Sequence, residues 1–168
     1  MKVLIGVVAT LALFAGAACS NSGAPVATPK TPSLEGGWRA HVTFASGPLK
    51  GVPFQFLITY SAGGGMVESS NFDEVPPVPP AYGSWGRTGP SNFKSTYIFW
   101  TTKTANAKDF TKGWTFSGIG VLNENISLSK TGDAYTSSIS YQLFDTKDQP
   151  LTGQSGTGAI TASRIIVG

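Results

Sequence analysis

The sequence predicts an all-β fold: a single antiparallel up-and-down β-barrel of eight strands, preceded by a signal peptide and a flexible linker. From residue 36 onward the apolar side chains alternate with a period of two, as in half-buried strands, and no amphipathic helical period occurs. Short clusters of Gly, Pro, Ser, Thr, Asn and Asp separate the alternating segments. Closing the strands into a barrel would remove the edge strands that an open sheet exposes.

The first four expected strands each gather their larger side chains on one face. In WRAHVTFAS this face carries Trp38, Ala40, Val42 and Phe44. In PFQFLITY it carries Phe54, Phe56, Ile58 and Tyr60. GMVESSN follows the glycine-rich turn AGGG and places together Met66, Glu68 and Ser70. YGSWGRT places on one face Trp85 and Arg87.

The last four expected strands are FKSTYIFWTT, GWTFSGIGVLNENISLS, AYTSSISYQLF and LTGQSGTGAITASRII. The sixth is long, and Asn123-Glu124-Asn125 could be a turn that splits it in two. The seventh places on one side Tyr135, Ile139, Tyr141 and Leu143. The eighth is rich in small residues, which suit either a packed interior or an open one.

The lengths of the connections predict one closed and one open end. Tight connections follow strands two, four and six (SAGGG, TGPSN and SKTGD), and looser ones follow the odd strands. In an up-and-down barrel these two sets lie at opposite ends. The loose loop between strands three and four carries Pro76, Pro77, Pro79 and Pro80, which we expect to stiffen a lid over the open mouth, with Asp73, Glu74 and Tyr82 beside the entrance.

The N-terminus predicts export. Residues 1–18 have a basic residue, an apolar run and small residues, as in a secretory signal peptide. The segment resembles a bacterial lipoprotein leader, in which Cys19 would become the lipidated first residue; an ordinary A-x-A cleavage site is the alternative. Residues 19–35 form a linker rich in Pro, Ser and Thr, and residues 36–168 form the barrel domain. The expected location is the cell envelope or the exterior, with membrane contact through the N-terminal lipid only.

Composition and residue counts argue against several functional classes. The net charge is +3 with no basic cluster, so no nucleic-acid partner is expected. The only histidine, His41, is expected on the outer face, and the only cysteine lies at the leader boundary. A nucleophilic triad, a zinc site and a phosphate-binding glycine loop therefore lack their residues, and we predict no catalytic residues, no metal and no cofactor.

Gly36-Gly37-Trp38 is similar to the G-x-W signature of lipocalins and other calycins, and the run from GGGMVESSN through GSWGRTGPSNFKST resembles bacterial secreted or lipoprotein barrels. The resemblance implies an eight-stranded barrel closed at one end by Trp38. It also implies an arginine from near the C-terminus above this tryptophan, for which Arg164 is the counterpart.

An eight-stranded barrel can be filled by side chains or hold one small ligand. If it holds a ligand, which we expect to be apolar or amphipathic, the predicted binding residues are Trp38, Phe56, Ile58, Tyr60, Met66, Glu68, Trp85, Arg87, Tyr97, Phe99 and Tyr141. Glu68 and Arg87 could pair across adjacent strands. Two other functions stay open: a small-molecule isomerase or cyclase that uses Glu68, and a surface interaction protein that acts through its loops. The oligomeric state is not predicted.

Overall fold

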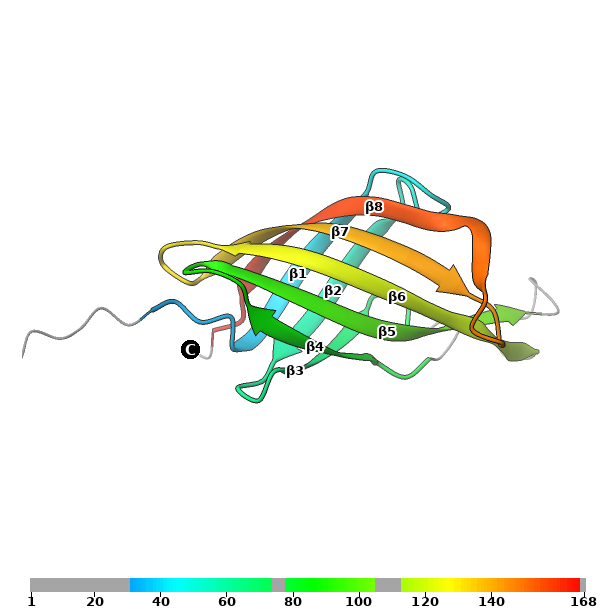
Figure 1. Ribbon diagram of the computed structural model, residues 1–168, viewed down its shortest axis with the longest axis horizontal. Helices are drawn as coiled ribbons and strands as arrows, with labels where there is room; N and C mark the ends of the chain where they lie inside the picture. The colour runs from blue at the N-terminus through cyan, green and yellow to red at the C-terminus, as the bar shows by residue number, and fades with distance from the viewer. Residues whose placement is uncertain (1–30, 74–77, 105–112, 167–168) are drawn as a thin grey trace, which may run out of the picture. The chain divides into compact units, whose positions relative to one another are not determined.

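A computed structural model of the chain describes residues 31–73, 78–104 and 113–166. These residues form a closed barrel in which each strand is antiparallel to the next and the last pairs with the first (Figure 1). The eight-stranded up-and-down fold predicted from the sequence is confirmed. The strands are β1 (Gly36–Phe44), β2 (Pro53–Tyr60), β3 (Gly65–Ser70), β4 (Ala81–Arg87), β5 (Asn92–Thr104), β6 (Trp114–Leu128), β7 (Ala134–Phe144) and β8 (Pro150–Arg164).

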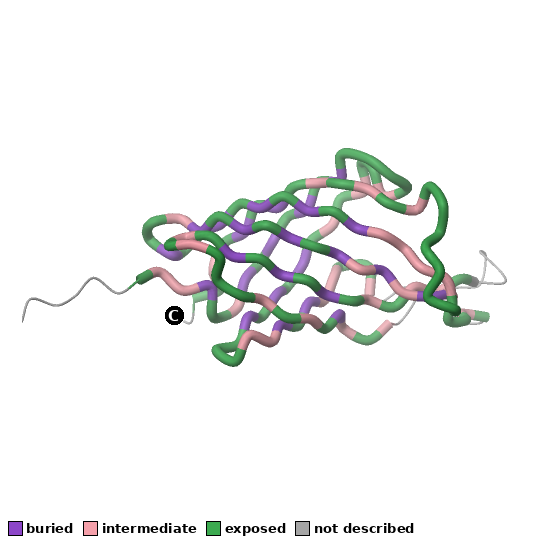
Figure 2. The backbone as a smooth tube through the Cα atoms, in the orientation of Figure 1, coloured by how far each residue is buried: buried purple, intermediate pink, exposed green. Residues whose placement is uncertain are grey.

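Burial alternates along the strands with the expected period of two (Figure 2). In β1 the buried set is Trp38, Ala40, Val42 and Phe44. His41 lies on the outer face and is exposed, as expected for that position. The core is therefore the barrel interior, to which the strands contribute alternate side chains, except that the first four residues of β8 are all exposed.

Strand β6 runs without interruption through Asn123-Glu124-Asn125. Asn123 and Asn125 are exposed on the outer face, where Thr96 Oγ1 donates a hydrogen bond to Asn123 Oδ1 at 2.8 Å. Glu124 lies between them and points inward. The polar triplet is thus strand rather than turn, because its two amides suit the solvent side of the pleat.

The closed end carries the short turns and both ends of the described chain (Figure 1). Trp38 is fully buried there, and the Arg164 guanidinium lies over its ring, with Cζ 4.3 Å from the ring centroid. Arg164 also donates hydrogen bonds to the carbonyl oxygens of Ser33, Glu35 and Gly132. The residues just before β1 belong to the same unit: Leu34 is fully buried, and its carbonyl accepts a 2.8 Å hydrogen bond from Trp38 Nε1.

The opposite end carries the longer loops. The loop between β1 and β2 is held inward by Tyr141, whose hydroxyl accepts a 3.3 Å hydrogen bond from the backbone N–H of Leu49. A β-bulge between β5 and β6 interrupts the register at Thr101 and Thr102, beside this rim. The part of the chain that the structure describes contains no helix long and apolar enough to span a bilayer.

Several predictions concern residues outside the described ranges. They include the signal peptide, most of the linker and the lipidation of Cys19. In the loop between β3 and β4, Glu74, Pro76 and Pro77 also fall outside those ranges.

Candidate functional site

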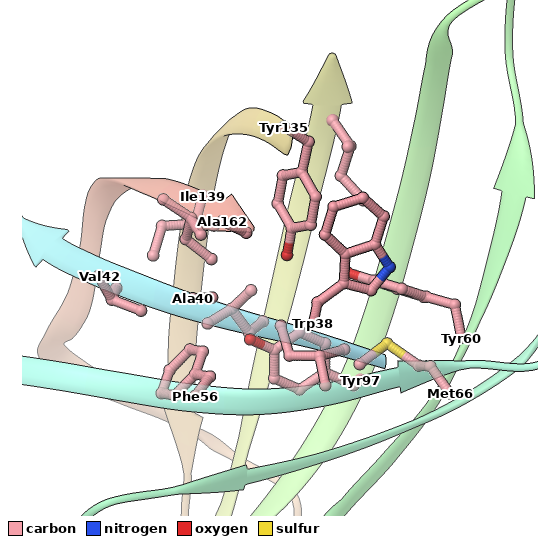
Figure 3. Packing of buried hydrophobic residues seen from close by; sticks show 14 of the residues in the cluster. Trp38, Ala40, Val42, Phe56, Tyr60, Met66, Tyr97, Tyr135, Ile139 and Ala162 are labelled. Atoms are coloured by element: carbon pink, nitrogen blue, oxygen red, sulfur yellow. The ribbon is translucent and has the colours of Figure 1, made fainter. Parts of the chain in front are cut away.

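The half of the barrel nearer the closed end is packed solid with side chains (Figure 3). The Trp38 ring meets the Tyr135 ring edge-on with 4.9 Å between their centroids, and Tyr60 makes a similar contact with Tyr135 at 6.5 Å. Ile58 and Met66 are buried in the same cluster. Of the predicted ligand-binding residues, this packed half holds Trp38, Ile58, Tyr60 and Met66.

The half nearer the open end contains a cavity of about 310 Å³. Of the predicted ligand-binding residues, those that line it are Phe56, Glu68, Tyr97, Phe99 and Tyr141. The rest of the wall was not predicted to bind a ligand, although the alternation had already placed Phe44, Phe54 and Leu143 on the same face of their strands as predicted binding residues. It also includes Leu49, Ala81, Trp100 and Leu122. The interior is therefore neither wholly packed nor wholly open.

Two aromatic rings of the wall lie flat because a glycine stands opposite each of them. Phe99 pairs across the sheet with Gly120, and a Cβ atom built on Gly120 would come within 2.0 Å of the Phe99 ring. Tyr141 pairs with Gly156, where a Cβ would come within 2.6 Å of the tyrosine ring. The small residues of β6 and β8 thus make room for the large residues of their neighbours, and the space inside remains open.

Trp85 and Arg87 lie at the closed end, away from the cavity. Trp85 Nε1 donates a 3.0 Å hydrogen bond to the carbonyl of Ser61, in the turn between β2 and β3. The exposed Arg87 guanidinium lies 4.4 Å from the centroid of the Phe93 ring and donates to the carbonyls of Pro32, Gly89 and Pro90.

The structure does not bring Arg87 to Glu68. Glu68 pairs in register with Ala81, at the start of β4, whereas Arg87 is the last residue of that strand. Six residues at about 3.3 Å each separate the two levels by roughly 20 Å along the strand. The sequence pattern predicted the face of each residue but not its height in the barrel.

Glu68 lies in the cavity wall with only 5% of its surface exposed, and its Oε1 has no hydrogen-bond partner. The Tyr97 hydroxyl, in the same wall, is also unpartnered, and Figure 3 shows it directed toward Phe56. Burial, and then the nearby carboxylates of Asp73 and Glu124, raise the pKa of Glu68 to about 8. At neutral pH the empty cavity therefore holds a mainly protonated Glu68.

Asp73 stands at the rim of the cavity, fixed by the chain around it. Ser70 donates to its carboxylate twice, from the backbone N–H to Oδ2 at 2.7 Å and from Oγ to Oδ1 at 2.8 Å. The Asp73 carbonyl accepts a 3.1 Å hydrogen bond from the Val78 N–H, and Val78 and Pro79 line the cavity beside it. Tyr82, which was expected beside the entrance, points to the outer face and is exposed.

A second carboxyl group, Glu124, lies deeper in the barrel, 1% exposed, and does not line the cavity. Its Oε2 accepts hydrogen bonds from Tyr60 Oη at 3.1 Å and Ser95 Oγ at 2.9 Å, and its Oε1 accepts one from Ser137 Oγ at 2.6 Å. Burial raises the pKa of Glu124, and the three hydroxyl donors offset part of that rise. Both carboxyl oxygens of Glu124 accept hydrogen bonds, so we interpret Glu124 and its three donors as a structural network.

The residues that the structure describes include no group of three or more His, Cys, Asp or Glu side chains placed to hold a metal ion. Comparison of the chain with protein-family models, with curated proteins and with solved structures finds no match. The function of the barrel is therefore inferred from its cavity.

Proposed function

We propose that this protein is an exported barrel, anchored by lipid at Cys19, that binds a small apolar or amphipathic molecule in the open half of its interior. The observation that carries the proposal is the cavity of about 310 Å³ with predominantly aromatic and aliphatic walls. Interiors of folded proteins are close-packed and seldom leave voids larger than a water molecule. A space of this size is comparable to the smaller ligand pockets of proteins, roughly 300 to 1,000 Å³.

The polar atoms of the cavity support the same function. An apolar wall gives affinity, whereas a few polar groups fix the orientation of a ligand. The unpartnered Oε1 of Glu68 and hydroxyl of Tyr97 are two such groups. Leaving a buried polar atom without a hydrogen-bond partner costs about 1–3 kcal/mol. A ligand that forms hydrogen bonds to both atoms removes this cost, which favours its binding.

A catalytic use of Glu68 is the second candidate function. A carboxylic acid whose pKa lies near 8 can give and take a proton at neutral pH, as the acid or base of an isomerase or cyclase must. The two candidates differ in what becomes of the bound molecule. A binding protein returns it unchanged, so mass spectrometry of the ligand before and after incubation separates them.

Fluorescence titration with N-phenyl-1-naphthylamine, a neutral lipophilic probe that brightens in apolar surroundings, tests binding in the cavity. Leu122 points into the cavity and the adjacent Val121 points outward, so the two form a matched pair on β6. We expect Leu122→Trp to fill the space and abolish probe binding, and Val121→Trp to retain it. Leu143→Trp, also at the cavity wall, serves if Leu122→Trp fails to fold.

Absence of probe binding to the parent protein would contradict the proposed function. Equal binding by the inward and outward tryptophan variants would also contradict it, because the probe would then sit on the outer surface. Circular dichroism of each variant verifies that the barrel is folded.

A further inference from the structure

We propose that the ligand of this cavity is a cationic amphiphile, with one ammonium group placed at Glu68 and Tyr97 and an apolar body held among the aromatic walls. This inference rests on the proposed function and adds the charge of the ligand to it. The observations that carry it are the charged residues of the cavity, the type of its walls and its unpartnered atoms.

In the part of the chain that is described, the cavity wall carries carboxyl groups and no basic side chain. The carboxyl groups are those of Glu68 in the wall and Asp73 at the rim, and no lysine, arginine or histidine lies among the lining residues. Glu124 adds a third carboxyl group below them and interacts electrostatically with Glu68. A ligand carboxylate would raise the pKa of Glu68 still further, whereas a cation would favour its ionised form.

The walls are also suited to a cation. Aromatic faces attract ammonium groups through their negative quadrupole, and aromatic cages recognise such groups in other proteins. The cavity is lined by the aromatic residues Phe44, Phe54, Phe56, Tyr97, Phe99, Trp100 and Tyr141. The same residues offer apolar contact to a hydrocarbon chain or ring.

The hydrogen-bonding capacity of an ammonium group matches the unpartnered atoms. A primary ammonium has three donors and no acceptor. Glu68 Oε1 and the Tyr97 hydroxyl oxygen can both accept from it, so one head group satisfies both. An alcohol can also reach both groups, by donating to one and accepting from the Tyr97 O–H, but it brings no positive charge to favour the ionised form of Glu68.

Binding of an ammonium releases a proton. The groups near Glu68 are Asp73, Glu124, Tyr97 and Tyr135, and burial raises the pKa of both tyrosines, which stay neutral. In the empty barrel burial and the two carboxylates raise the pKa of Glu68 to about 8, so its carboxyl group is mainly protonated at pH 7. An adjacent ammonium favours the carboxylate: the acid O–H bond breaks, its proton leaves to the buffer, and an ion pair forms. A neutral ligand displaces no proton.

Calorimetry with octylamine, 1-octanol and octanoate tests the proposal, because the three share one chain and differ in the head group. We expect octylamine to bind at least about tenfold more tightly than 1-octanol, and octanoate to bind most weakly. At pH 7, titration in phosphate and in Tris buffers should report release of close to one proton for each octylamine bound, and none for 1-octanol.

Two variants with the same change of charge locate the effect. Glu68→Gln should weaken octylamine binding by about tenfold or more, eliminate the proton release, and leave 1-octanol within about threefold of the parent. Asp148→Asn lies in the β7–β8 loop at the same end but outside the cavity, and should leave all three affinities unchanged. Asparagine tolerates the positive φ of 58° at this position.

The outcomes separate the two proposals. If 1-octanol binds as tightly as octylamine, or if Glu68→Gln leaves octylamine binding unchanged, the cationic ligand is rejected and the proposed function survives. If the Asp148→Asn variant loses as much affinity as Glu68→Gln, the effect is one of net charge, and the site at Glu68 is rejected. If none of the octyl compounds and no neutral lipophilic probe binds, the proposed function itself fails.

Discussion

Glu68 is a buried acid whose neighbours among the described residues include no cation, and this has a consequence for stability as well as for binding. Its pKa, about 8 in the folded protein against 4.5 for an ordinary glutamic acid, means that the folded state holds a proton that the unfolded state has lost. The stability that this proton confers is fully present below about pH 4.5 and is lost as the pH rises through about 8. Within that window the loss is at most roughly 1.4 kcal/mol for each pH unit.

We therefore expect Glu68→Gln to flatten the pH dependence of stability and to make the protein more stable than the parent at pH 8. The free energy of unfolding from urea titrations at pH 5, 6, 7 and 8 measures this. Glu124 also has a raised pKa and contributes a slope of the same sign in both proteins, so the difference between the two curves reports Glu68 together with its interaction with Glu124. Parallel curves for the two proteins would show that Glu68 is not protonated in the folded state.

The two buried carboxyl groups also show what the alternation could predict and what it could not. Alternation placed Glu68 inward correctly, because a strand puts every second side chain on one face. It could equally have placed Glu124 inward, between Leu122 and Ile126, but the flanking asparagines left a turn open as the alternative to a continuous strand. Three hydroxyl donors from other strands stabilise this buried acid, and partners so far apart in sequence are not visible in a local pattern.

At the scale of strands, the open space depends on small residues that stand opposite large ones. Gly120 is the clearest case, because the Phe99 ring occupies the volume that its side chain would need. Gly120→Ala should push this ring into the cavity, weaken binding of the naphthylamine probe, and lower stability by about 1–3 kcal/mol through overpacking. Fluorescence titration and urea unfolding measure the two effects.

The matched control is Gly86→Ala on β4, where a Cβ atom would have nothing within 4 Å. We expect this variant to change neither probe binding nor stability appreciably. If the two alanine variants behave alike, glycine at position 120 does not shape the cavity.

Strand pairing also explains why some site residues could be predicted and others could not. The face of Arg87 followed from the alternation within β4, but its distance from Glu68 depended on the register between β3 and β4. Register is set by the turn and by contacts between strands, and a one-strand pattern does not contain it. The same reason accounts for Trp85, which lies beside the turn of β2 and β3 instead of in the cavity.

In the whole molecule, the two halves of the barrel have different roles. The closed half supplies most of the packed core, and the open half supplies the cavity. The sequence predicted the two ends from loop lengths alone, because up-and-down connectivity forces alternate loops to opposite ends. It could not predict where packing stops, since this depends on the sizes of side chains that meet from several strands.

The position of a lipid anchor is a prediction at this scale. If Cys19 is acylated, the anchor precedes β1 in the chain, and β1 begins at the closed end of the barrel. Mass spectrometry of protein from the native membrane fraction should show a diacylated or triacylated N-terminal Cys19, and Cys19→Ser should move the protein to the soluble fraction. A free, unmodified mature N-terminus would contradict the prediction.

The start of β1 and the end of β8 lie together at the closed end, and this has a mechanical consequence. β1 and β8 are antiparallel neighbours, and force applied through the two ends enters the barrel between them at Arg164. Such a force acts across the strands and opens their backbone hydrogen bonds one after another, as in a zipper. Handles placed in loops at opposite ends would instead load many hydrogen bonds in shear at once. The same barrel should therefore yield at low force when drawn out by its ends and resist strongly when stretched along its axis.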